Sequence, residues 1–235
     1  MERATIQKEE TMCGRFTLTL DPGDLQEELN LNISSVALTP RYNIAPSQPV
    51  AVVRDGVSRS VEMFQWGLVP SWAKDVSIGY KMINARSETI AEKPSFRAPF
   101  ARQRCLILAD GFYEWAQTDT AAGGKTPYYF YMKDHKPFTF AGLWEEWKPP
   151  EGDPLRTCTI ITCAANDTLK PYHERMPVIL PEELRWLWLD PAARIPELQS
   201  WLMPYTAGEM TCHPVATLVN KPDMDSAELI APLAG

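Results

Sequence analysis

Proline is the residue that most constrains how this chain can fold. The 235 residues include 21 prolines, a share well above the average of ~5% in globular proteins. Because proline fixes φ and lacks a backbone N–H, it ends helices and central strands after short runs. The apolar runs between these breaks are short, and Gly, Pro or Asp bounds most of them. The sequence therefore predicts many loops and short strands.

These apolar runs favour strands over helices. Strand patterns cover residues 50–54, 60–66, 105–109, 128–132, 138–143 and 157–164, with no regular helical crossovers between them. Helical patterns are fewer, and they cover a short helix capped by Asp21 and the segments 89–102, 181–189 and 196–203. Residues 148–154 are expected to form a hairpin loop. Few and clustered helices favour an α+β fold over α/β, in a single domain.

Composition excludes several classes of protein. Hydrophobic residues make up 45% of the chain and charged residues 23%, which is typical of a soluble globular protein. No apolar run approaches the ~18–20 residues of a membrane span, and residues 1–11 lack the apolar core of a signal peptide. We therefore expect a cytoplasmic protein with no membrane contact. The five cysteines contain no Cys-x-x-Cys pair, so neither a disulfide framework nor a metal site is expected.

The charge distribution leaves a nucleic-acid partner open. A net charge of −7 argues mildly against a protein coated in nucleic acid, because such binding uses clustered Lys and Arg. A local basic groove remains compatible with it, and so does a mixed solvated surface. Arginines gather near the motifs described below, at positions 15, 41, 86, 97, 102, 104 and 175.

Cys13 follows Met12 near the start of the chain. If Cys13 becomes the first residue, it carries both a free α-amine and a thiol. The amine can form an imine with an aldehyde, and the thiol can close on the imine carbon to give a five-membered thiazolidine, with the advantage of an intramolecular step. Taken alone, Cys13 is better explained as an ordinary small cysteine, because cysteine is among the residues most often buried.

Three polar residues lie in apolar or constrained surroundings. Asn84 and Arg86 lie within the run Met-Ile-Asn-Ala-Arg, and Glu114 lies between aromatic residues just after the apolar run 105–109. A carboxylate that is partly desolvated by aromatic neighbours is suited to proton transfer. A strand carboxylate paired with an arginine is an equally good interpretation of Glu114 alone.

The chain has three histidines, and they differ in context. His173 lies between two prolines in a polar segment, where it is suited to move protons near neutral pH or simply packs a loop. His213 precedes a proline, which holds it extended and favours a packing role. His135 is expected in an exposed hairpin turn.

Seven segments form an ordered set along the chain: MCGRF (12–16), RYNIAP (41–46), WGLVPSW (66–72), INARSET (83–89), CLILADGFYEW (105–115), PYHERMP (171–177) and HPV (213–215). Together they resemble the SOS response-associated peptidase (SRAP) family, whose members include proteins that crosslink to abasic sites in single-stranded DNA. The resemblance extends from Met12 to about Ile230. The resemblance implies a mainly antiparallel, barrel-like core with a few short helices.

The resemblance also implies roles for individual residues. Cys13 would be the nucleophile, whose amine and thiol capture the ring-opened deoxyribose aldehyde. Glu114 would move protons, Asn84 would hold the sugar or the N-terminal amine, and His173 would assist ring opening and reversal. No cofactor is implied. Lyase activity at abasic sites is a further implied chemistry.

The same resemblance implies how DNA is held. Arg15, Arg41 and Arg86 would contact phosphates that flank the lesion, and Pro46 and Trp72 would wedge or stack against bases. The family pattern sometimes has a second aromatic residue after the tryptophan, where this chain has Ala73. The expected partner is single-stranded DNA with abasic sites, with single-strand/duplex junctions as a further candidate. A monomer is expected, associated with the nucleoid in a bacterium.

The N-terminus departs from the family pattern, in which the cysteine directly follows the initiator methionine. We expect residues 1–12 to be an extension that is absent from the mature protein or cleaved from it, residues 13–235 to form the SRAP domain, and the tail from about residue 222 to be loosely held. Two other functions stay open. One is a thiol autopeptidase that removes its own leader, and the other is a non-catalytic module that binds single strands or modified bases.

Overall fold

A computed structural model describes residues 14–117 and 124–233 of the chain. The strands are β1 (Phe16–Leu18), β2 (Arg41–Ile44), β3 (Pro49–Val53), β4 (Val61–Trp66), β5 (Asn84–Arg86), β6 (Arg104–Ala109), β7 (Gly111–Gln117), β8 (Lys125–Met132), β9 (Phe138–Trp147), β10 (Leu155–Ala164), β11 (Arg175–Pro177) and β12 (Met210–Pro214). The α-helices are α1 (Pro22–Leu29), α2 (Arg97–Arg102), α3 (Glu182–Arg185) and α4 (Ile195–Ser200). Short 3₁₀ turns complete the described part: η1 (Val76–Lys81), η2 (Leu187–Leu189), η3 (Ala207–Glu209), η4 (Thr217–Asn220) and η5 (Ala227–Ile230).

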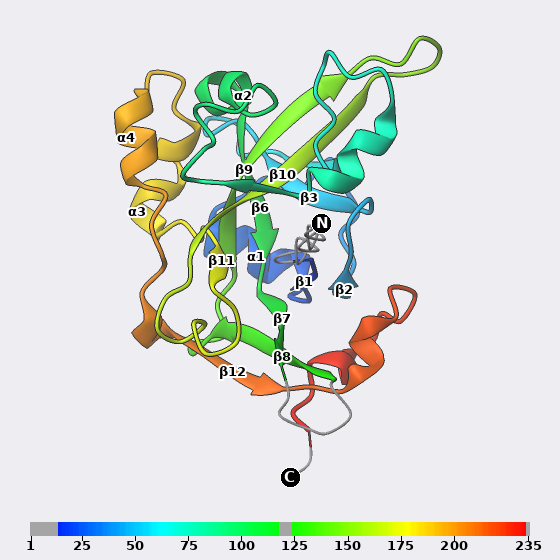
Figure 1. Cartoon of the computed structure of the whole chain (residues 1–235), viewed down its shortest axis with the longest axis vertical. Helices are drawn as coiled ribbons and strands as arrows, with labels where there is room; N and C mark the ends of the chain where they lie inside the picture. Colours follow the sequence, from blue (N-terminus) through cyan, green and yellow to red (C-terminus); the bar gives the residue numbers. More distant parts are fainter. Residues whose placement is uncertain (1–13, 118–123, 234–235) are drawn as a thin grey trace, which may run out of the picture.

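One sheet closes on itself to form a small barrel (Figure 1). Around the ring the order is β10, β4, β3, β6 and β9, and β9 pairs again with β10. β10 joins β9 in antiparallel fashion and β4 in parallel fashion. Short β5 and β11 also pair with β10, nearer its C-terminal end. The barrel-like core and the α+β class predicted from the sequence are therefore confirmed.

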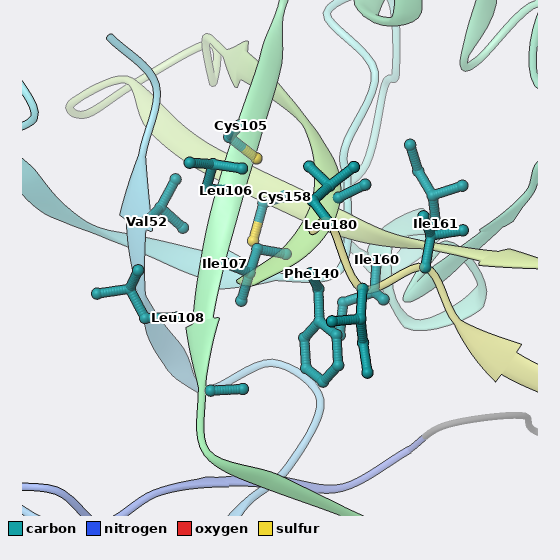
Figure 2. Close-up of a cluster of buried hydrophobic side chains, with 14 of the residues drawn as sticks. Val52, Cys105, Leu106, Ile107, Leu108, Phe140, Cys158, Ile160, Ile161 and Leu180 are labelled. Carbon is teal, nitrogen blue, oxygen red and sulfur yellow. The ribbon is translucent and has the colours of Figure 1, made fainter. Parts of the chain in front are cut away.

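Apolar side chains fill the barrel. Ile107 of β6, Val52 of β3 and Ile160 of β10 are fully buried and belong to one cluster of apolar side chains (Figure 2). Burial of apolar side chains in a closely packed interior is the main favourable contribution to the stability of a domain. The barrel is therefore a rigid support for the loops and strands at its edges.

A second sheet, in the order β12-β8-β7-β1-β2, lies beside the barrel (Figure 1). Its inner face packs on the barrel, where the rings of Phe112 and Phe130 stack 5.3 Å apart and Phe16 meets Phe140 at 5.6 Å. Its outer face carries a separate small core, in which Tyr113 and other side chains pack against the C-terminal segment. Alternate residues along these strands thus belong to two different cores.

The predicted strands are all present, and the hairpin loop at 148–154 joins β9 to β10. The prediction of a helix at 89–102 is wrong for most of its length, since only Arg97–Arg102 is helical. Residues 89–96 form turns, because Pro94 disfavours the helical conformation of the residue before it. Segment 181–189, predicted as one helix, divides into α3 and η2. Asp21 caps α1 as predicted, since its carboxylate accepts a hydrogen bond of 2.9 Å from the N–H of Gly23.

The C-terminal segment differs from the loosely held tail that we expected from about residue 222. Leu229 is fully buried on the outer face of the second sheet. The Asp225 carboxylate accepts hydrogen bonds from the backbone N–H groups of Tyr42 (2.5 Å) and Asn43 (3.1 Å). The segment is packed because it covers apolar side chains that the sheet would otherwise expose. No helix in the described part of the chain is long and apolar enough to cross a membrane.

Gly142 of β9 marks the tightest point of the barrel. It pairs with Cys105 of β6 on one side and with Ile160 of β10 on the other. A Cβ at this position would lie 2.9 Å from the Sγ of Cys105, 2.9 Å from the Cδ1 of Ile107 and 3.1 Å from the backbone oxygen of Thr159. Only glycine leaves room for the strands on both sides.

We predict that Gly142→Ala destabilises the protein by about 1–3 kcal/mol, the usual cost of overpacking a core. The matched control is Gly208→Ala, where a Cβ would meet nothing within 4 Å, and its stability should stay within about 0.5 kcal/mol of wild type. Urea unfolding followed by tryptophan fluorescence measures both. Equal stability of the two variants would contradict the assignment of Gly142 to a closed barrel.

Candidate active site and nucleic-acid interface

Cys13 lies outside the described residues, but the chain that follows it is placed by β1. Phe16 and Thr17 pair with Phe112 and Gly111 of β7. The N–H of Tyr113 donates to the backbone oxygen of Arg15 at 3.0 Å, in the same register. Continued by one residue, this antiparallel register directs Gly14 toward Glu114.

The Asp110 carboxylate fixes the other end of β1. It accepts hydrogen bonds from the Thr17 hydroxyl (2.5 Å), the Thr19 N–H (2.5 Å) and the Leu20 N–H (3.0 Å). These bonds tie the end of β1 to the start of β7. The direction in which the chain runs back toward Cys13 is therefore determined at both ends of the strand.

Glu114 lies on the inner face of the second sheet, where only 3% of its surface is exposed. Its partner across the strands is Tyr128 of β8, and the Tyr128 ring lies 4.4 Å from the ring of Tyr172. Glu114 takes part in an interaction within the molecule. A carboxylate held in such aromatic surroundings is fixed in position and shielded from bulk water, as a proton-transfer group requires.

His173 follows Tyr172 directly and is half-buried. Its Nδ1 lies 3.1 Å from the Arg175 N–H and 3.3 Å from the Arg175 backbone oxygen. The shorter contact favours Nδ1 as an acceptor, which leaves the proton of the neutral ring on Nε2. Because Tyr172 contacts Tyr128, the structure brings the His173 segment to the same face of the second sheet as Glu114.

Asn84 and Arg86 lie on β5, opposite Ile160 and Thr162 of β10. β11 pairs with the other edge of β10, so the His173 segment and β5 flank the same strand. Asn84, which is half-buried, takes part in an interaction within the molecule. β10 thereby carries candidate residues on both of its edges.

Arg175 joins these two flanking segments. Its guanidinium binds the Glu88 carboxylate through both terminal nitrogens, and one of them also donates to the backbone oxygen of Thr162 at 2.7 Å. The hydrogen bond from Arg175 lowers the pKa of Glu88. Both residues lie within the sequence motifs, but the sequence predicted no role for either of them. The pair locks the start of β11, and with it the backbone that contacts His173.

Arg15 and Arg41 have partners inside the protein. Arg15 donates through Nη1 to Asn43 Oδ1 (2.9 Å) and to the backbone oxygen of Val219 (2.5 Å), and burial lowers the pKa of its guanidinium. Arg41 forms an ion pair of 2.5 Å with Asp225. Both arginines therefore hold the C-terminal segment against the second sheet, a structural role that the sequence did not predict.

Arg86, Pro46 and Trp72 present surfaces to solvent. Arg86 is exposed, and within the described ranges it forms no ion pair. Pro46 is half-buried in the turn between β2 and β3. Trp72 is 60% exposed, which leaves a large ring free to stack.

The backbone around Trp72 is held firmly although the ring is exposed. The N–H of Ser71 donates to the buried Glu145 carboxylate at 3.0 Å, and the indole N–H of Trp147 donates to the Ala73 backbone oxygen at 2.8 Å. An exposed aromatic ring on a fixed backbone loses little conformational entropy when it stacks on a ligand. Trp72 is thus well placed as a stacking platform.

The remaining histidines lie outside this site. His213 of β12 packs beside Tyr129, with its Nε2 2.8 Å from the Ile230 backbone oxygen. His135 is in an exposed turn with φ of 58°. The packing role predicted for His213 and the exposed turn predicted for His135 are confirmed, but this turn does not join a hairpin, because β8 and β9 belong to different sheets. Across residues 14–117 and 124–233, no cluster of three or more His, Cys, Asp or Glu side chains is arranged to hold a metal ion.

Comparison with known proteins decides the family. The model of the SOS response associated peptidase (SRAP) family matches residues 12–222. The chain belongs to this family. The resemblance that its sequence motifs indicated is confirmed.

Relatives of this SRAP protein cover nearly its whole length. The abasic site processing protein YoqW of Bacillus subtilis (strain 168) is 48% identical over 223 residues, which cover 93% of this chain and 99% of YoqW. The abasic site processing protein HMCES of Gallus gallus is 35% identical, over 83% of this chain and 66% of HMCES. A crystal structure of a Bacteroides thetaiotaomicron protein is 26% identical with a TM-score of 0.86, covering 94% of this chain and all of that one.

We predict that Arg15→Ala lowers the free energy of unfolding by about 1–3 kcal/mol, because the fully buried Asn43 amide loses its donor. In a domain of this size, each kcal/mol lowers the Tm by about 2–4 °C. Arg86→Ala should leave the Tm unchanged, since the side chain is exposed. Thermal unfolding followed by circular dichroism compares the two. An unchanged Tm for Arg15→Ala would show that its internal hydrogen bonds are unimportant.

Proposed function

We propose that this protein recognises abasic sites in single-stranded DNA and captures them covalently through Cys13. The observation that carries the proposal is the register of β1 and β7, which directs the chain next to Cys13 toward the buried Glu114. The His173 segment meets the same face of the sheet through Tyr172 and Tyr128. The names of the relatives, abasic site processing proteins, fit this chemistry.

The proposed reaction uses the aldehyde of the ring-opened deoxyribose. The α-amine of Cys13 adds to the aldehyde carbon, and loss of one water gives an imine. The thiol then adds to the imine carbon and its proton passes to the nitrogen, so that a thiazolidine ring forms. Capture releases one water overall and needs neither oxidant nor reductant. Closure is fast because amine and thiol belong to one residue.

The neighbouring residues supply the proton transfers. Glu114 accepts a proton from the attacking amine and returns it to the departing hydroxyl, so it is not consumed. Asn84 holds the sugar or the amine by hydrogen bonding. His173, with a proton on Nε2, assists opening of the sugar ring and the reverse reaction. The ion pair between Arg175 and Glu88 acts as a positioning element for His173.

We infer that DNA is held by surfaces around this site. Trp72 stacks on a base, as aromatic residues do in proteins that bind single strands, and Pro46 wedges against a neighbouring base. Arg86 contacts a phosphate with its exposed guanidinium. Arg15 and Arg41 contribute mainly by fixing the fold, since a phosphate would compete with their internal partners.

The N-terminus must be free for this reaction, because an amine in a peptide bond cannot form an imine. We propose that the active protein begins at Cys13 and lacks residues 1–12. Removal of these residues by the Cys13 thiol itself is compatible with later capture and agrees with the word peptidase in the family description.

We predict that protein beginning at Cys13 forms a heat-stable adduct with a single strand that contains an aldehydic abasic site. A strand with a tetrahydrofuran in place of the abasic site, which has no aldehyde, should give none. Cys13→Ala should abolish the stable adduct, and Cys13→Ser should leave an imine that only a reductant traps. Denaturing gels and intact mass spectrometry measure the yield and the N-terminus. Protein that retains Met1 and still gives full yield would refute the mechanism.

We predict that Glu114→Gln and Arg86→Gln affect different steps. Glu114→Gln should slow adduct formation at saturating DNA by about 10²–10⁴-fold, the usual contribution of a general acid/base, and leave DNA affinity near wild type. Arg86→Gln should weaken affinity and reduce its salt dependence, with little change in rate at saturation. Single-turnover time courses and fluorescence anisotropy separate the two steps. A Glu114→Gln variant with the wild-type rate would assign this carboxylate to structure alone.

A further inference from the structure

Arg185, at the end of α3, is a buried charge without an internal partner. Only 8% of its surface is exposed. Its Nε has no hydrogen-bond partner in the described part of the chain, and its guanidinium forms no hydrogen bond or ion pair there. Burial lowers the pKa of Arg185, and the electrostatic influences of Glu182 and Tyr205 oppose this shift. A buried guanidinium in this state is costly unless something pairs with it.

Arg104 shows how the same fold treats a buried arginine that is purely structural. It is 5% exposed, and its guanidinium donates to the backbone oxygens of Trp188 (2.7 Å), Ala101 (2.7 Å), Phe100 (3.0 Å) and Asp190 (2.7 Å). These oxygens offset the loss of hydration. The difference between the two arginines is therefore one of partners and not of burial.

Arg185 lines an open cleft of about 460 Å³, next to the chain that leads into β12. α3 and this chain lie on the same side of the barrel (Figure 1). The cleft is also lined by three buried apolar side chains, Met132, Phe138 and Leu180. A volume in this range accommodates a small organic molecule, and the cleft combines these apolar side chains with several charged groups.

The charged groups of the cleft limit what can bind Arg185. Lys136 is paired with Glu28 at 3.2 Å, and Lys133 donates to the Gly208 backbone oxygen at 2.7 Å, so both lysines already have partners. Acidic residues also line the cleft: Asp134, Glu182 and Glu209. They repel a ligand with several negative charges, such as a nucleic-acid backbone or inorganic phosphate at neutral pH. A single negative charge is the best match.

We propose that this cleft binds a small monocarboxylate, with the carboxylate on the guanidinium of Arg185 and an apolar body against Phe138, Leu180 and Met132. Arginine binds a planar carboxylate through two parallel hydrogen bonds. The site is separate from the residues proposed for DNA capture and does not depend on that function.

Benzoate is a suitable probe, with benzamide as its neutral counterpart of the same shape. Benzoate should raise the Tm of the wild-type protein by a few degrees in a concentration-dependent way, because a ligand that binds only the folded state stabilises it. Benzamide and inorganic phosphate should give no comparable shift. In Arg185→Met, benzoate affinity should fall at least about tenfold, as expected for loss of a charge-assisted hydrogen bond.

The stability of the ligand-free variants gives an independent test of the unpaired charge. Arg185→Met should raise the Tm, since methionine removes a buried charge at similar volume. The matched control Arg104→Met should lower it, because four bonded backbone oxygens lose their donor. A loss of stability in Arg185→Met equal to that in Arg104→Met would overturn the premise.

Methyl NMR of the wild-type protein locates the ligand without any variant of Arg185. With methionine methyl groups labelled, benzoate should shift the signal of Met132, which lines the cleft, and leave Met63, an exposed residue on β4, unchanged. The proposal would be refuted by equal shifts at both methionines or by equal binding of benzamide. It would also be refuted if Met132 showed no shift at benzoate concentrations that raise the Tm.

Discussion

The hydrogen-bond ladder along β10 is the constraint on which the rest of the structure depends. The antiparallel pairing with β9 and the parallel pairing with β4 close the barrel, and the pairings with β5 and β11 place Asn84 and the His173 segment on opposite edges of the same strand. Each ladder bond contributes only about 0.5–1.5 kcal/mol net. Their value is geometric, because residues more than seventy positions apart in the chain are held at fixed spacing by one strand.

The second sheet uses the two faces of its strands for different tasks. Along β7, Phe112 and Glu114 face the barrel, whereas Tyr113 faces the C-terminal segment. A buried carboxylate among apolar rings is a cost to folding, and it is tolerated here because the stacked phenylalanines and the outer core stabilise the strand on both sides. Arg15 and Asp225 then fasten the outer covering. The C-terminal segment thus supports the position of Glu114 from the opposite face.

The sequence predicted the five barrel strands, β8 and the α+β class, because runs such as 157–164 combine β-branched residues with clear ends. It did not predict β1, β2, β5, β7, β11 and β12 as strands. Of these, β1, β5 and β11 have only three residues each, which carry almost no periodic signal and are extended because a partner strand lies beside them. The motifs include the segments that contain Glu114 and His173, and the structure brings the His173 segment against Tyr128, the cross-strand partner of Glu114. The sequence could not distinguish the exposed Arg86 from the arginines that have partners or are buried, namely Arg15, Arg41, Arg104 and Arg185. The burial of an arginine is decided by distant parts of the chain.

Net charge and the partners of the arginines together bear on how such a protein would hold DNA. The chain has a formal charge of −7, and the guanidinium groups of Arg15 and Arg41 are already used by the fold. Few phosphate contacts remain, and each contributes a salt-dependent part of the affinity. Reversible binding would therefore rest on stacking at the firmly held Trp72 and would be weak. In the proposed function a covalent bond compensates for this, because it converts a brief encounter into a lasting complex without a strongly basic surface.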